Sequence, residues 1–91
     1  MPAMADVVVY ATMFCPFCHR AKKLLKHKGV DFREIDVTMN KSKREEMTKL
    51  AGGDHKVPQI WINGEHIGGC DELYALENAG KLDAKLQGDA A

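Results

Sequence analysis

The hydrophobic residues of this chain fall into short blocks whose spacing alternates between that of strands and that of helices. The run Val7-Val8-Val9-Tyr10 is β-branched and aromatic, which predicts a buried strand over about Asp6–Ala11. After a short loop, Pro16 opens a segment with helical periodicity, and Gly29 suits its C-terminal cap. The apolar positions of this segment are Phe17, Ala21, Leu24 and Leu25. The first helix should therefore begin directly after Cys15.

A second strand and a second helix follow. Val30–Val37 carries spaced apolar residues before the turn-forming Thr38, and a strand–helix–strand order makes the two strands parallel. Ser42 and Glu45 have the spacing of a capping box, which predicts an amphipathic, partly exposed helix that ends at Gly52-Gly53.

The last third of the chain combines a hairpin with a helix. Gln59–Ile62 and Glu65–Ile67 flank Asn63-Gly64, a pair that tolerates the positive φ angles of a type I′ turn, so these two strands should be antiparallel. Apolar residues at helical spacing predict a helix from Asp71 to Gly80, and Leu82–Leu86 should add a final helical turn.

The order of these elements fixes the expected fold class. A β-α-β-α-β-β-α sequence predicts an α/β fold with a four-stranded mixed sheet flanked by helices on both faces. The 91 residues suffice for a single domain, with a core over about residues 6–86 and flexible tails at residues 1–5 and 87–91.

Charge and hydropathy narrow the range of partners. Thirteen Lys and Arg residues balance thirteen Asp and Glu residues, so no overall field favours nucleic acid or an anionic membrane as a partner. The apolar runs are too short to span a membrane, and residues 1–5 lack the basic region and apolar core of a secretion signal. We therefore expect a cytoplasmic protein.

Two of the three cysteines form a motif that carries chemistry. Cys15-Pro16-Phe17-Cys18 follows a predicted buried strand and opens a helix, the setting in which Cys-x-x-Cys is redox-active. The free N–H groups and the dipole at the helix start favour a thiolate, so Cys15 should be substantially ionised at neutral pH and act as the nucleophile. Cys18 lies one turn further on, within reach of Cys15 but shielded, which suits a resolving thiol.

A zinc site is the structural alternative for this pair. His19, His66 or Cys70 would have to complete the ligand set, and the sequence contains no second closely spaced ligand pair of the usual kind. Redox chemistry without a bound metal is therefore the favoured prediction. For Cys70, buried packing is favoured over a reactive role.

Four ordered motifs resemble those of the glutaredoxins, within them the small bacterial dithiol group. The likeness runs over almost the whole chain, from Val8 to about Leu86. The motifs are Cys15-Pro16-Phe17-Cys18-His19-Arg20-Ala21, Lys43-Arg44-Glu45-Glu46-Met47, Val57-Pro58-Gln59-Ile60 and Ile67-Gly68-Gly69-Cys70-Asp71-Glu72-Leu73. The resemblance implies a thioredoxin fold and a glutathione-dependent thiol-disulfide oxidoreductase, with glutathione as reductant and no permanently bound cofactor.

The resemblance also implies a groove for glutathione beside Cys15. In the family the proline matching Pro58 is cis, and the backbone before it pairs with the cysteinyl residue of glutathione. The start of the last helix takes the γ-glutamyl carboxylate on its N–H groups, Asp71 meets the adjacent ammonium, and Arg44 reaches the glycyl carboxylate. The expected glutathione-binding residues are Thr12, Phe17, Arg44, Lys56, Val57, Pro58, Gly69, Cys70 and Asp71.

Three of these positions depart from the family pattern. Thr12 stands where many relatives carry lysine, which removes a cation near the thiolate. Lys56 replaces the usual threonine, and its charge could partly compensate if its side chain points into the groove. Phe17 stands where tyrosine is common and keeps an aromatic wall without the hydroxyl.

Family likeness also suggests the partners. They are glutathione, glutathionylated proteins and protein disulfides, with ribonucleotide reductase a plausible substrate, and the chain is expected to act as a monomer. Two alternatives stay open. One is an electron donor fed by thioredoxin reductase, and the other is an iron-sulfur carrier in which Cys15 and glutathione bridge a cluster between two protomers.

Overall fold

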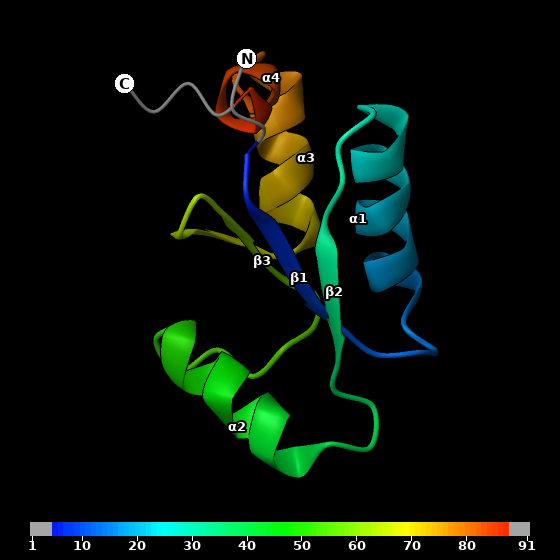
Figure 1. Ribbon diagram of the computed structural model, residues 1–91, viewed down its shortest axis with the longest axis vertical. Helices are drawn as coiled ribbons and strands as arrows, with labels where there is room; N and C mark the ends of the chain where they lie inside the picture. Colours follow the sequence, from blue (N-terminus) through cyan, green and yellow to red (C-terminus); the bar gives the residue numbers. More distant parts are fainter. Residues whose placement is uncertain (1–4, 88–91) are drawn as a thin grey trace.

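A single four-stranded sheet organises the computed structural model, which describes residues 5–87 (Figure 1). The strand order across the sheet is β2-β1-β3-β4. The strands are β1 (Val7–Ala11), β2 (Arg33–Asp36), β3 (Gln59–Ile62) and β4 (Glu65–Gly68). The helices are α1 (Pro16–His27), α2 (Lys41–Leu50), α3 (Cys70–Asn78) and α4 (Leu82–Leu86).

The pairing of the strands makes the sheet mixed, as predicted. Val9 of β1 lies opposite Glu34 of the parallel strand β2 and opposite Ile60 of the antiparallel strand β3. Strands β3 and β4 form the predicted hairpin, and both turn residues have positive φ, 53° at Asn63 and 81° at Gly64. The expected thioredoxin fold is thereby confirmed.

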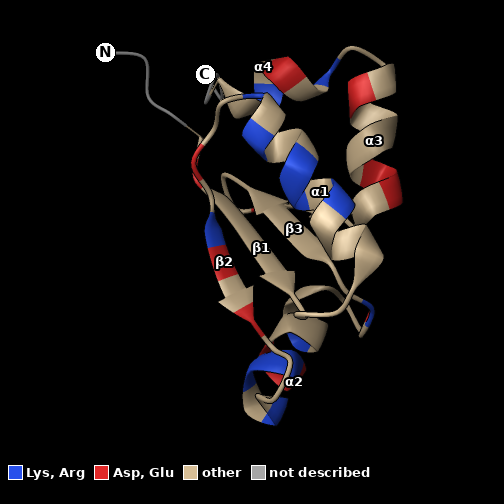
Figure 2. Ribbon diagram, turned by 90° about the vertical axis from the view of Figure 1, so that its right-hand side faces the viewer, with Lys and Arg blue, Asp and Glu red and all other residues tan. Residues whose placement is uncertain are grey.

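The alternation of side chains along β1 divides the core between the two faces of the sheet. Val7, Val9 and Ala11 pack with buried residues of α1, α3 and α4, whereas Tyr10 packs on the other side with Val37 and with Met47 of α2. Figure 1 shows α1 and α3 on one side of the sheet and α2 on the other, and Figure 2 shows α1 crossing in front of the strands. Helices on both faces were predicted.

Strand β2 is shorter than predicted. Pairing with β1 begins where Arg33 lies opposite Val8 and ends at Asp36, so residues 30–32 and Val37 of the predicted strand lie outside it. Val30 and Phe32 pack against the core cluster instead of joining the sheet.

Helix α2 is capped by a residue that the sequence analysis did not select. The Asn40 side chain accepts hydrogen bonds from the Lys43 N–H and the Ser42 hydroxyl, both over 3.1 Å, and the helix begins at Lys41. Asn is as good an N-cap as Ser, and once Asn40 occupies that place Ser42 falls inside the first turn. The predicted Ser42–Glu45 capping box is therefore wrong.

The limits of the domain differ slightly from those predicted. Ala5 is buried in the core, so the ordered part begins one residue before the predicted limit, and α3 begins at Cys70 instead of Asp71. Of the other predicted tail residues, Gln87 is exposed and caps the end of α4, and residues 1–4 and 88–91 lie outside the described residues. Within residues 5–87, no helix is both long and apolar enough to cross a membrane.

Candidate active site

Cys15 occupies the N-cap of α1, at the end of the loop that leaves β1. Its backbone is extended, and Pro16 at the first helical position needs no hydrogen-bond partner for its nitrogen. The Cys15 Sγ accepts a hydrogen bond from the Cys18 N–H over 3.3 Å. The sulfur thus lies at the positive end of the helix, as the sequence predicted.

Cys18 lies one turn into α1 and is fully buried. Burial raises the pKa of the Cys18 thiol to about 12, and its hydrogen bond with Cys15 acts in the same direction, while the backbone and side chain of Thr12 act against it. Both cysteines are free thiols. The site therefore offers one partly exposed sulfur and a second, protonated thiol beneath it.

The loop before β3 contributes a wall beside Cys15. The Val57–Pro58 peptide bond is cis, as the resemblance implied. The Cys15 thiol contacts the Val57 carbonyl oxygen, with a sulfur–oxygen distance of 3.8 Å. The nucleophilic sulfur and the backbone expected to hold its ligand are thus neighbours.

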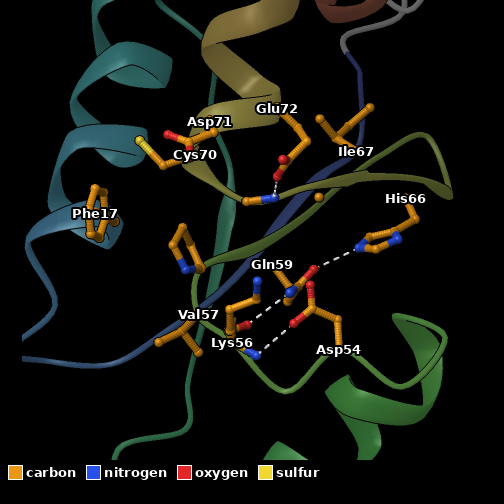
Figure 3. A pocket seen from close by; sticks show the side chains of 13 residues that line it. Phe17, Asp54, Lys56, Val57, Gln59, His66, Ile67, Cys70, Asp71 and Glu72 are labelled. Carbon is orange, nitrogen blue, oxygen red and sulfur yellow. Dashed lines mark hydrogen bonds between the residues drawn. The ribbon is translucent and has the colours of Figure 1, made fainter.

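A groove of about 440 Å³ runs between this loop, β4 and the start of α3 (Figure 3). It brings together seven of the expected glutathione-binding residues, namely Phe17, Lys56, Val57, Pro58, Gly69, Cys70 and Asp71. Four further polar residues line it that the sequence did not indicate as ligand contacts, namely Asp54, Gln59, His66 and Glu72. Gln59 could have been noticed, because it is the polar residue in the otherwise apolar run of β3.

Two expected binding residues do not line this groove. The Arg44 guanidinium donates to the His55 carbonyl through Nε and Nη2, over 3.3 and 2.9 Å, and lines a separate hollow beside α2. Thr12 interacts with the buried Cys18 thiol. Their contribution to ligand binding stays a prediction.

Two glycines shape the corner where β4 meets α3. Gly68 has a φ of +115°, and a Cβ there would lie 2.8 Å from the Glu72 side chain. At Gly69 a Cβ would lie 3.2 Å from the Pro58 carbonyl oxygen, and the Gly69 N–H donates to the Glu72 carboxylate over 2.6 Å. The next N–H groups, in the first turn of α3, have no partners within the helix because of their position.

Cys70 is 5% exposed, and burial raises the pKa of its thiol, in agreement with the predicted packing role. The zinc alternative gains no support, because within residues 5–87 no three His, Cys, Asp or Glu side chains are grouped so as to hold a metal ion. Two of its candidate ligands have other hydrogen-bond partners, the Met13 carbonyl for His19 and the Gln59 side chain for His66.

Comparison with known proteins agrees with this site. The glutaredoxin family model matches residues 7–67. Glutaredoxin 3 of Escherichia coli K12 is 54% identical over 84 residues, which span 92% of this chain and 100% of that protein.

Solved structures show the same fold. The solution structure of glutaredoxin from Brucella melitensis superposes with a TM-score of 0.84 at 46% identity, covering 100% of this chain and 99% of that one. The crystal structure of a buckwheat glutaredoxin-glutathione complex superposes with a TM-score of 0.83 at 29% identity, covering 96% and 83% of the two chains. The family match and these relatives agree with the paired thiols at the start of α1. The chain therefore belongs to the glutaredoxin family of glutathione-dependent thiol-disulfide oxidoreductases.

Proposed function

We propose that Cys15 is the nucleophile of this oxidoreductase and Cys18 its resolving thiol. The observation that carries the proposal is the contrast between the two sulfurs, because Cys15 is partly exposed at the helix start while Cys18 is buried and protonated beneath it. A thiolate is the attacking species in disulfide exchange, and a buried protonated thiol is held in reserve.

The reaction with a glutathionylated protein has two exchange steps. The Cys15 thiolate attacks the glutathionyl sulfur, a Cys15–glutathione disulfide forms, and the protein sulfur leaves and takes up a proton. A second glutathione thiolate then attacks the same glutathionyl sulfur, which releases Cys15 and forms glutathione disulfide. With a protein disulfide, Cys15 attacks first and Cys18 displaces the substrate, which leaves a Cys15–Cys18 disulfide for glutathione to reduce.

The groove beside Cys15 is the proposed glutathione site. A glutathione complex of a structural neighbour supports it, together with the lining residues around Val57 and Asp71. The Val57 backbone would pair with the cysteinyl residue, the first N–H groups of α3 with the γ-glutamyl carboxylate, and Asp71 with the ammonium group. The Lys56 ammonium and Arg44 would supply positive charge for the glycyl carboxylate.

The proposed substrates are glutathionylated proteins and protein disulfides, among them ribonucleotide reductase. We propose that the protein acts as a monomer in the reducing environment of the cytoplasm, without a permanently bound cofactor.

The deciding experiment compares two electron sources for one glutathionylated substrate. Glutathione with glutathione reductase should sustain turnover, and thioredoxin reductase without glutathione should not. Turnover with thioredoxin reductase alone would overturn the proposal in favour of the thioredoxin-reductase-fed electron donor. Absorbance of protein purified without oxygen tests the other rival, because visible cluster bands would indicate an iron-sulfur carrier.

A further inference from the structure

Gln59 is the one polar side chain that is fully buried within residues 5–87, and its amide is hydrogen-bonded to Lys56 and His66 at the edge of the groove (Figure 3). Its Nε2 donates to the Lys56 carbonyl over 2.9 Å, and its Oε1 lies 2.7 Å from the Nε2 of His66. A buried amide is costly unless it is paired, so both bonds matter to its placement.

These contacts determine which group donates and which accepts in the hydrogen bonds that link Lys56, Gln59 and His66. A backbone carbonyl can only accept, so the atom of Gln59 that faces Lys56 is the NH₂ group. The oxygen of Gln59 then faces His66, and the His66 Nε2 must carry the hydrogen. His66 is itself held by stacking on Trp61, with ring centres 4.8 Å apart and planes inclined by 29°.

The hydrogen bond between Gln59 and Lys56 encloses the backbone that is proposed to face the ligand. Lys56 precedes Val57 and Gln59 follows Pro58, so the Gln59 amide closes a short ring around the cis peptide whose carbonyl contacts Cys15. A hydrogen bond from the Lys56 N–H to Asp54, over 3.0 Å, fixes the same residue from its other side. His66 connects this ring to β4.

We infer that Gln59 and His66 are positioning residues, which hold the Val57 backbone at the distance from Cys15 that glutathione binding needs. The inference rests on the proposed glutathione site. His66 is an exposed residue of a surface strand, and the inference gives it an effect on substrate affinity. His66 exerts this effect through Gln59 and Lys56 and touches no reacting atom.

The test uses two substitutions at position 66. His66→Phe keeps a ring for stacking on Trp61 but removes the donor, and it should raise KM for a glutathionylated peptide about three- to tenfold while kcat stays within about twofold. His66→Gln places an amide nitrogen at a similar reach and should restore the KM of the unmodified protein. His27→Phe, an exposed substitution in the last turn of α1, is the matched control and should change neither constant.

NMR of the same proteins provides a readout that does not depend on turnover. The imidazole nitrogen shifts should identify the tautomer with hydrogen on Nε2 in His66, and the Val57 amide signal should move in His66→Phe and return in His66→Gln. A hydrogen on Nδ1 of His66, or an unmoved Val57 signal in His66→Phe, would overturn the inference. Because these signals do not depend on turnover, this outcome is distinct from a failure of the proposed glutathione-dependent activity. Active unmodified protein with an unchanged KM in His66→Phe would overturn it while leaving the proposed function intact.

Discussion

The Cys18 N–H donates to the Cys15 Sγ over 3.3 Å, so the residue that follows one helical turn later helps to stabilise negative charge on the first sulfur. The two cysteines are thus unequal before any substrate arrives, since Cys15 is partly exposed and Cys18 is buried. The first prediction follows from this inequality.

Cys15→Ser should abolish reduction of both glutathionylated substrates and protein disulfides, because it removes the attacking sulfur. Cys18→Ser should retain the first activity and lose most of the second, since a second glutathione can resolve the Cys15–glutathione disulfide without Cys18. Both reactions are measured on both variants. Equal inactivity of the two variants towards a glutathionylated peptide would contradict the assigned roles.

The extent of alkylation, measured as a function of pH, tests whether the buried Cys18 thiol is protected from reaction. Burial disfavours the charged form and raises the pKa of Cys18 to about 12, so Cys18 should stay largely protonated and unreactive well below that pH. Iodoacetamide at about pH 7 to about pH 10 should therefore add one group per chain, on Cys15, as read by mass spectrometry. Denatured protein, in which all three thiols are accessible, is the control. Peptide mapping distinguishes Cys18 from Cys70, and modification of Cys18 at about pH 8 would show that Cys18 is not protected.

Asp71→Ala and Arg44→Ala should each raise KM for a glutathionylated substrate, because each removes a charge proposed for one end of glutathione. Since Asp71 is exposed and Arg44 is half-buried, the rise should be about two- to fivefold for each. Asp31→Asn, an exposed change in the loop before β2, is the charge control. Unchanged kinetics in both alanine variants would remove the proposed binding mode.

Thr12→Lys should accelerate alkylation of Cys15 at about pH 6, because a nearby cation favours the thiolate. Ser42→Lys adds the same charge on α2 and should leave the rate unchanged. A rate for Thr12→Lys equal to or below that of the unmodified protein would mean that the missing family lysine does not weaken thiolate stabilisation here.

Urea unfolding tests the observed cap of α2. Asn40→Ala should lower the free energy of unfolding by about 1 kcal/mol, because the Lys43 N–H loses its acceptor. Ser42→Ala should cost less than about 0.5 kcal/mol, as expected for an exposed residue inside the first turn. A larger loss for Ser42→Ala would restore the capping box that the sequence pattern suggested.

The sequence alone determined the order of elements, the hairpin at Asn63-Gly64 and the pairing of Cys15 with Cys18 at a helix start. These features depend on residues close together in the chain, whose φ preferences, periodicity and capping act locally. The resemblance added the cis bond before Pro58, which the structure contains.

The tertiary structure decided which distant residues share the groove. Gln59 and His66 lie on different strands, and only the register of the β3–β4 hairpin brings the buried amide against the imidazole. Arg44, by contrast, contacts the His55 carbonyl outside the groove, although its motif suggested a ligand contact. Local patterns cannot specify such contacts, because a side chain takes its partner from whatever packing places beside it, and packing is a property of the whole chain.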